Sequence, residues 1–141
     1  MFDLNVIALG VCTREAIAVM KRRGINDGHI INISSISGHG IPTGVGKHVY
    51  CASKHAVRLL TEGIRAELNA QKSGIKITTI CPGVVRTEIF DVGGWAGAGY
   101  EEMPALEDKD IAAAVISAMA TPPHMLVADI VVRPVGEEVM A

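Results

Sequence analysis

A tyrosine and a lysine one helical turn apart are the residues of this sequence best suited to acid–base chemistry. Tyr50 and Lys54 stand four positions apart in HVYCASKHAV, and on a helix such residues share one face. An ammonium beside a phenol favours the phenolate, so Lys54 would lower the pKa of Tyr50. A tyrosine tuned in this way can donate or accept a proton near neutral pH. Alone, however, the pair also fits a lysine whose apolar stem lies beside an interfacial tyrosine.

Two other segments would bring polar groups to the same place. Ser35 follows one apolar, β-branched run, and Pro82-Gly83 follows the next. Ligands of open α/β sheets bind beyond the carboxyl ends of the strands. A hydroxyl, the helix of Tyr50 and Lys54, and the backbone groups of a Pro-Gly turn would therefore meet at one edge of a sheet. Core packing by itself requires no such arrangement.

The elements that would position these residues alternate along the chain. Apolar periodicity of a helical kind predicts helices over 2–23, 47–72 and 107–120. Short β-branched runs bounded by Gly or Pro predict strands over 28–35, 75–81 and 125–132. Alternating helices and strands imply right-handed crossovers and a parallel sheet with helices on both faces. We therefore expect an α/β fold with a partial, doubly wound parallel sheet.

Composition and charge exclude several classes of protein. The chain has 141 residues, 49% of them hydrophobic and 20% charged, which is typical of one ordered domain. A net charge of −2 argues against a general attraction to nucleic acid or anionic membranes. No run approaches the roughly 18 apolar residues of a membrane-spanning helix. Three cysteines without CxxC spacing, and no secretory signal, are typical of reduced thiols in a cytoplasmic protein.

With these motifs in view, the sequence resembles the short-chain dehydrogenases/reductases. The matching motifs keep the order and spacing of that family, and they are Asn32-x-Ser34-Ser35-x-x-Gly38, Tyr50-x-Ala52-Ser53-Lys54 and Pro82-Gly83-x-Val85-x-Thr87. Asn5, within Phe2-Asp3-Leu4-Asn5-Val6, looks like the asparagine of a helix in the family. The ending Asp129-Ile130-Val131-Val132-Arg133-Pro134 is most similar to an animal subgroup that includes ketosteroid reductases and insect farnesol dehydrogenases.

The resemblance implies a role for each matching residue. Tyr50 would be the general acid/base at the substrate carbonyl or alcohol, and Lys54 would lower its pKa and hold the nicotinamide ribose. Ser35 would hydrogen-bond the substrate oxygen, and Asn5 would bind a water that links Lys54 to solvent. The implied reaction is hydride transfer between a nicotinamide and a small apolar alcohol or ketone.

Two serines compete for the role at the substrate oxygen. Ser37 lies 13 residues before Tyr50 and Ser35 lies 15 before it. Ser35 occupies the Ser-x-x-Gly position directly after the predicted strand, so we assign the role to Ser35. The loop over 39–49 would then be slightly longer than the shortest version in the family.

The resemblance also implies where the cofactor binds. Backbone groups and one hydroxyl would line its nicotinamide and pyrophosphate side, from Tyr50, Lys54, Pro82, Gly83, Val85 and Thr87. The similarity to the animal subgroup favours NADP, with NAD as the other possibility. The residues that choose between the two lie near the end of a second strand that this sequence does not show.

The resemblance extends to only part of the family's domain. Members begin with a strand and a Thr-Gly-x-x-x-Gly-x-Gly turn that cradles the pyrophosphate on a helix N-terminus, and 1–141 contains no such turn. We therefore expect 1–141 to be the C-terminal half of one Rossmann-like domain, lacking the glycine-rich dinucleotide-binding half. Such a chain alone should bind dinucleotides weakly or not at all. The alternative function is an inactive fragment that acts in assembly, and helices 2–23 and 47–72 would make a homodimer.

A metal site is the remaining catalytic alternative. His39, His48 and His55 lie near Cys51 in the sequence, and Cys51 and His55 share a helix face. No carboxylate cluster accompanies them, and the loop and helix that carry them already have another explanation. We expect no metal.

Two other pairs of residues have competing explanations. Trp95 and Tyr100 lie in a glycine-rich stretch that corresponds to the family's substrate lid, so they would either shape an apolar pocket or cover a loop. Glu62 and Arg65 are three apart on a helix, which predicts a solvated ion pair.

Overall fold

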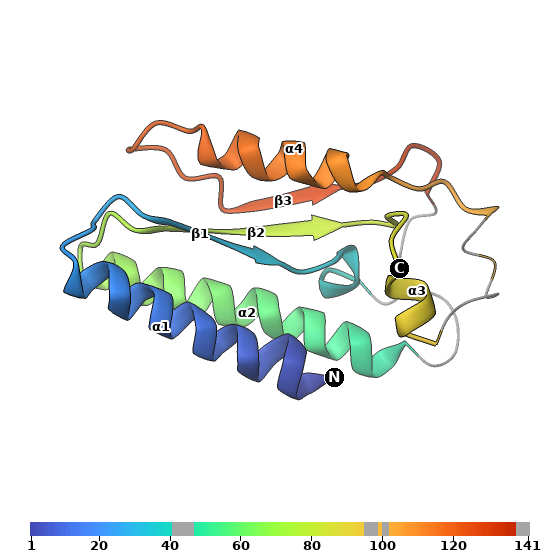
Figure 1. Cartoon of the computed structure of the whole chain (residues 1–141), viewed down its shortest axis with the longest axis horizontal. Helices are drawn as coiled ribbons and strands as arrows, with labels where there is room; N and C mark the ends of the chain where they lie inside the picture. Colours follow the sequence, from blue (N-terminus) through green and yellow to red (C-terminus); the bar gives the residue numbers. More distant parts are fainter. Residues whose placement is uncertain (41–46, 95–98, 100–101, 138–141) are drawn as a thin grey trace.

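In the computed structural model of the chain, the described residues are 1–40, 47–94, 99 and 102–137. A three-stranded parallel sheet in the order β1-β2-β3 lies at the centre (Figure 1). Its strands are β1 (His29–Ile33), β2 (Lys76–Pro82) and β3 (Asp129–Val132). The predicted α/β fold with a parallel sheet is confirmed.

Helices cover both faces of this sheet, as Figure 1 shows. On one face lie α1 (Leu9–Arg22) and α2 (His48–Ala70), and on the other lies α4 (Asp108–Met119). Three short helical segments complete the described chain, namely η1 (Asp3–Ala8), η2 (Ile36–Gly38) and α3 (Ile89–Val92). The bounds of α2 and α4 agree with the predicted helices to within a few residues.

The core forms where β2 meets the helices. Every residue of β2 after Lys76 is buried, because β2 has a strand on either side and a helical layer on each face. Val57 of α2 and Ile77 and Ile80 of β2 are 0% exposed. Burial of such side chains stabilises the fold by roughly 1.5–3 kcal/mol each, so α2 is held firmly against the sheet.

The end of α1 follows the predicted pattern. Gly24 has a φ of 68°, in the left-handed region that favours glycine. The Ile25 N–H donates to the Met20 carbonyl at 2.9 Å and the Gly24 N–H donates to the Lys21 carbonyl at 3.1 Å. These two hydrogen bonds make the Schellman motif that stops a helix.

The start of the first helix differs from the prediction of one helix over 2–23. Residues 3–8 form a π-helix, η1, before the α-helix begins at Leu9. Apolar periodicity does not distinguish the two forms, since both place the same residues on one broad face. π-helical turns are rare in proteins, and those that occur are frequently found at functional sites. Here the π-helix contains Asn5.

The third strand is shorter than predicted, since residues 125–128 lie outside it. Side chains take carbonyls there that a strand would offer to a neighbouring backbone. Lys76 Nζ donates to the Met125 carbonyl at 3.0 Å, and Thr78 Oγ1 donates to the Val127 carbonyl at 2.6 Å. The apolar pattern of MLVADIVV therefore continues beyond the strand that it predicts.

The long connection over 84–106 contains more structure than the predicted irregular loop. It includes α3 and an isolated parallel bridge between Val85 and Leu106. Trp95 and Tyr100 lie outside the described residues, so the lid hypothesis has no structural counterpart here.

One side of the molecule leaves apolar groups uncovered. Leu4, Ile7 and Val11 are 75%, 59% and 43% exposed and form a stripe along η1 and α1. Among the described residues, β1 pairs with β2 alone, so its other edge has no strand beside it. Unpaired edges and apolar stripes are the surfaces through which chains associate.

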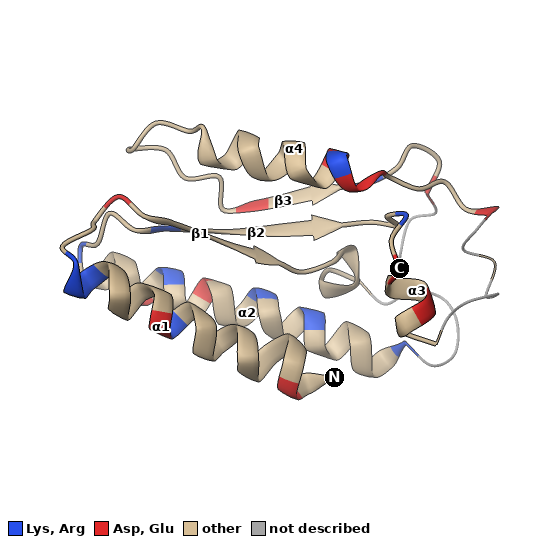
Figure 2. Cartoon of the chain, in the orientation of Figure 1, with Lys and Arg blue, Asp and Glu red and all other residues tan. Residues whose placement is uncertain are grey.

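Charged residues lie mostly outside the sheet. Figure 2 shows both signs spread along the helices and connections. Each strand carries at most one charge, Lys76 in β2 and Asp129 in β3. Within the described part of the chain, no helix has the length and apolar content needed to cross a membrane.

Candidate active site

Tyr50 and Lys54 lie one turn apart near the start of α2, as predicted. Lys54 Nζ is 5.7 Å from the centroid of the Tyr50 ring. The same ammonium donates a hydrogen bond to the Ile33 carbonyl at 3.2 Å. Lys54 therefore links the tyrosine helix to the carboxyl end of β1, where a ligand of an α/β sheet would bind.

Lys54 lies in a half-buried environment that affects its own ionisation. Burial lowers the pKa of Lys54 below its usual value, because desolvation disfavours the charged form, while the nearby Cys81 acts in the opposite direction. A half-buried ammonium also interacts more strongly with an adjacent phenol than one in water. Lys54 is therefore placed where its charge, when present, acts on the Tyr50 ring.

Ser35 stands between β1 and the Pro-Gly turn. Its hydroxyl accepts a hydrogen bond from the Ser37 N–H at 3.1 Å and donates to the Pro82 carbonyl at 3.5 Å. The residue is 8% exposed and has an extended backbone that begins η2. Ser35 thus lies at the junction of the two strand ends that the sequence predicts to converge.

Asn5 reaches the same helix through a buried serine. Asn5 Nδ2 donates to Ser53 Oγ at 3.1 Å, and Ser53 Oγ donates to the Tyr50 carbonyl at 2.7 Å. Ser53 is 0% exposed. Sequence reasoning assigned Ser53 no role, although it stands inside the Tyr50-x-Ala52-Ser53-Lys54 motif. Its place between two predicted site residues makes it a positioning group.

The turn after β2 carries the predicted cofactor-binding residues. The Gly83 N–H donates to the Val132 carbonyl at 2.7 Å, which continues the pairing of β2 with β3. The Leu106 N–H donates to the Val84 carbonyl at 2.8 Å, and the Arg86 N–H donates to the Leu106 carbonyl at 2.9 Å. Val84 and Arg86 are therefore both hydrogen-bonded to Leu106, later in the same connection.

Val85 differs from these two neighbours. Among the described residues, none hydrogen-bonds its peptide N–H or C=O. One backbone donor and one backbone acceptor on the same residue match a primary carboxamide, the group that nicotinamide carries. The residues present therefore fit the nicotinamide end of the predicted cofactor.

Thr87 lies further along the same turn and is exposed. Its Oγ1 accepts a hydrogen bond from the Ile89 N–H at 3.4 Å, at the start of α3. Of the predicted cofactor-binding residues after β2, Pro82, Gly83 and Val85 thus lie close to the strand end, and Thr87 lies at the outer edge of the turn.

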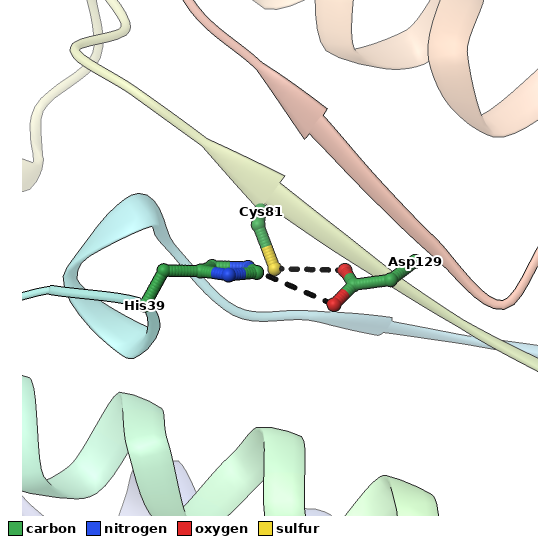
Figure 3. Close-up of side chains that lie close together, drawn as sticks. All are labelled: His39, Cys81 and Asp129. Atoms are coloured by element: carbon green, nitrogen blue, oxygen red, sulfur yellow. Dashed lines mark hydrogen bonds and ion pairs between the residues drawn. The ribbon is translucent and has the colours of Figure 1, made fainter.

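A second cluster, made of His39, Cys81 and Asp129, lies close by (Figure 3). Cys81 Sγ donates to Asp129 Oδ1 at 3.2 Å, and His39 Nε2 is 3.6 Å from Asp129 Oδ2. Arg58 Nε and Nη2 both donate to Asp129 Oδ2 at 3.2 Å, and Arg58 Nη1 donates to the Gly38 carbonyl at 2.9 Å. The carboxylate is thus shared by a thiol, an imidazole and a guanidinium.

This cluster connects β2 and β3 to the residue after η2 through a hydrogen bond and an ion pair. Burial, and then the hydrogen bond to Asp129, raise the pKa of the Cys81 thiol to about 12, so it remains a protonated donor. The guanidinium of Arg58 balances the charge of Asp129 and repels a second cation. His55, one of the histidines weighed as a metal ligand, instead hydrogen-bonds the Cys51 carbonyl through Nδ1 at 2.9 Å.

The predicted solvated pair of Glu62 and Arg65 is wrong for its basic member. Arg65 is buried, and it donates to the Ile77 carbonyl at 3.3 and 3.2 Å and to the Ala128 carbonyl at 2.9 Å. Only Glu62 is exposed, and the two side chains form an ion pair. Arg65 takes this position because the Ile77 carbonyl of β2 lies beneath α2 and gains a donor there. The Ala128 carbonyl, already bonded by the Thr79 N–H at 3.0 Å, accepts a second hydrogen bond.

Comparison with known proteins places this chain among similar sequences. The family model described as short chain dehydrogenase matches residues 1–95. Dehydrogenase/reductase SDR family member 11 of Bos taurus is 48% identical over 139 residues, which cover 95% of this chain and 54% of that protein. Farnesol dehydrogenase of Aedes aegypti is 42% identical over 138 residues, covering 98% of this chain and 54% of the relative.

Solved structures agree with these sequence matches. The closed form of serine dehydrogenase complexed with NADP+ is 31% identical and has a TM-score of 0.86, covering 100% of this chain and 57% of that one. A 4-hydroxyisoleucine dehydrogenase complexed with NADH is 25% identical with a TM-score of 0.72. The chain spans about half the length of the curated relatives that it matches. It belongs to the short-chain dehydrogenase family.

Proposed function

We propose that this member of the short-chain dehydrogenase family is part of an NADP-dependent oxidoreductase that acts on a small apolar alcohol or ketone. The observation that carries the proposal is the placement of Lys54. Its Nζ lies 5.7 Å from the centroid of the Tyr50 ring and donates a hydrogen bond to the Ile33 carbonyl at the end of β1. The similarity to a farnesol dehydrogenase favours an apolar alcohol. The similarity to an enzyme complexed with NADP+ favours that cofactor, and NAD is the second candidate.

In this mechanism the protein supplies proton transfer and orientation. The Tyr50 hydroxyl donates a proton to the carbonyl oxygen during reduction and accepts it from the alcohol during oxidation. Lys54 lowers the pKa of that hydroxyl and holds the cofactor ribose, and Ser35 donates a hydrogen bond to the substrate oxygen. A bound nicotinamide would supply the hydride-transfer chemistry.

The other predicted residues act around this centre. Asn5 holds a water that connects Lys54 to solvent, while its amide positions α2 through Ser53. Pro82, Gly83 and the N–H and C=O of Val85, which have no partner among the described residues, bind the nicotinamide side, and Thr87 adds a hydroxyl toward the pyrophosphate. No metal takes part in this chemistry.

We further propose that residues 1–141 correspond to the C-terminal half of the family domain. The coverage of 54% of the curated relative's length supports this, and so does the outer edge of β1, which pairs with no other strand among the described residues. The proposed protein is cytoplasmic.

A non-catalytic role in assembly is the second candidate function. The exposed stripe of Leu4, Ile7 and Val11 favours it, because such a surface suits a helical interface between two copies. Predicted helices 2–23 and 47–72 would supply that interface. A homodimer would be compatible with either function.

Hydride transfer tests the proposal directly. NADPH oxidation with apolar ketones is measured for the protein expressed from its native gene and for residues 1–141 alone. We expect turnover by the first and weak or no NADPH binding by the second. Absence of turnover with either cofactor in the natively expressed protein would favour the assembly function.

A Tyr50→Phe variant tests the catalytic assignment. Loss of the hydroxyl should lower kcat by about 100-fold or more, since general acid–base catalysis contributes roughly 100- to 10,000-fold. The melting temperature should stay unchanged, because the ring that contacts Lys54 remains. A variant that keeps its activity would sink the assignment of Tyr50.

A further inference from the structure

The turn after β2 is held by a carboxylate from the far end of the chain. Glu137 Oε1 accepts a hydrogen bond from the Val84 N–H at 2.9 Å. Glu137 Oε2 accepts one from Arg133 Nε at 2.6 Å. The side chain of Glu137 is only 3% exposed. A buried carboxylate costs free energy unless its oxygens are paired, and here each oxygen has a donor.

The local backbone brings Glu137 to this place. The Glu137 N–H donates to the Pro134 carbonyl at 3.2 Å, which closes a four-residue turn. Gly136, the third residue of that turn, has a φ of 87°, as a type II turn requires at this position. The turn folds the chain back, so that Glu137 meets Arg133 and lies against the Pro-Gly turn.

The approach of Glu137 depends on a missing side chain. A Cβ on Gly83 would lie 2.6 Å from Glu137 Oε1 and 2.7 Å from Oε2, closer than such atoms pack. Sequence reasoning assigned Gly83 to the cofactor. The structure adds a separate reason for glycine, which is the space that the Glu137 carboxylate needs.

Val84 is consequently fixed on both sides. Glu137 holds its N–H, and the Leu106 N–H holds its C=O at 2.8 Å. The N–H and C=O of the next residue, Val85, have no hydrogen-bond partner among the described residues. Immobilising Val84 therefore sets the direction in which Val85 presents its donor and acceptor.

From these contacts we propose that Glu137, held by Arg133, is a positioning residue that sets the orientation of the cofactor-binding turn through Val84. This inference rests on the proposed function, since it concerns how that turn meets the nicotinamide. It adds a residue outside every motif that the sequence showed. Glu137 acts through Val84 and touches no reacting atom.

Three variants of the natively expressed protein test this role. Glu137→Ala removes both hydrogen bonds, whereas Glu137→Gln keeps an oxygen that can accept from the Val84 N–H. Glu62→Gln is the matched control, because Glu62 also pairs with an arginine on its own segment but lies on the outer face of α2. NADPH dissociation constants, and KM and kcat for NADPH, are measured for each.

We expect Glu137→Ala to raise the dissociation constant and KM for NADPH about tenfold, the size of one charge-assisted hydrogen bond. KM should change more than kcat, because the reacting groups on α2 stay in place. Glu137→Gln should recover most of the affinity, and Glu62→Gln should match the unmodified protein. An affinity for NADPH in folded Glu137→Ala within twofold of the unmodified protein would overturn the proposal.

Amide hydrogen exchange of Val84 in residues 1–141 provides a test without cofactor. We expect slow exchange of the Val84 N–H, and exchange as fast as that of exposed loop amides would overturn the proposal even if Glu137→Ala failed to fold. If the natively expressed protein bound neither NADPH nor NADH, the proposed function would fail. Slow exchange at Val84 would still support the clamp by Glu137.

Discussion

The two sides of the candidate site are held by different kinds of structure. The side that carries Tyr50 and Lys54 belongs to a helix of 23 residues packed on the sheet. The side that carries Pro82, Gly83 and Val85 is a turn held by single hydrogen bonds from distant parts of the chain. Regular packing makes the first side rigid, while the second depends on a few polar contacts.

The helical side has buried residues on every turn that faces the sheet. Ser53, Val57 and Thr61 are each 0% exposed, and each polar group among them is hydrogen-bonded. Asn32 of β1 donates to Thr61 Oγ1 at 2.9 Å, which ties the strand to the middle of α2. Changes at the tip of α2 should therefore alter chemistry without loosening the helix.

The largest effect of a change at this end of α2 is expected for Lys54→Met. We expect kcat to fall by about 100-fold, because in the proposed mechanism Tyr50 would lose the charge that favours its phenolate. The pH profile should also move, with the apparent pKa of the catalytic group rising toward the ordinary phenol value of about 10. The melting temperature should not fall, since burial already disfavours the ammonium of Lys54.

That prediction has a clear contrary result. A lower melting temperature in Lys54→Met, with an unchanged pH profile, would mean that Lys54 is a structural link to the Ile33 carbonyl and does not tune Tyr50.

Arg65→Met examines why α2 is rigid. The substitution removes the side-chain donor of the Ile77 and Ala128 carbonyls, of which Ala128 keeps a hydrogen bond from the Thr79 N–H, and we expect the free energy of unfolding to fall by about 2 kcal/mol. Urea denaturation measures it. Glu62→Gln, at the exposed end of the same ion pair, should change the value by less than about 0.5 kcal/mol. Equal effects of the two substitutions would contradict the buried role of Arg65.

The smallest expected effect concerns His39, which belongs to the cluster with Cys81 and Asp129. Burial, and then the nearby Arg58, lower the pKa of His39 below 6.5 in spite of Asp129. The unfolded chain therefore binds a proton more readily than the folded one, so stability falls as pH drops from 6.5 through the folded pKa.

Replacing this histidine should remove that part of the acid sensitivity. The free energy of unfolding of His39→Gln should decrease less between pH 7 and pH 5 than that of the unmodified chain. His29, whose pKa is also lowered by burial, remains in both proteins and cancels in the comparison. Identical pH dependence in the two proteins would mean that His39 titrates as it does in the unfolded chain.

Much of the fold follows from local patterns. The period of α2 and the β-branched runs of β1 and β2 predicted those elements closely, because one face of each is buried against the others. Local patterns were insufficient where a side chain replaced a backbone partner. Thr78 takes the Val127 carbonyl, which shortens β3, and Arg65 takes carbonyls beneath α2.

The sequence by itself determined the helical face of Tyr50 and Lys54, the two strand ends that converge beside it, and the turn at Pro82-Gly83. These follow from spacing along a helix or strand, which is a local property of the chain. Only the tertiary structure decided that Glu137 holds Val84, 53 positions earlier in the sequence. Such a contact depends on β3 lying beside β2, because that pairing alone brings the two segments together.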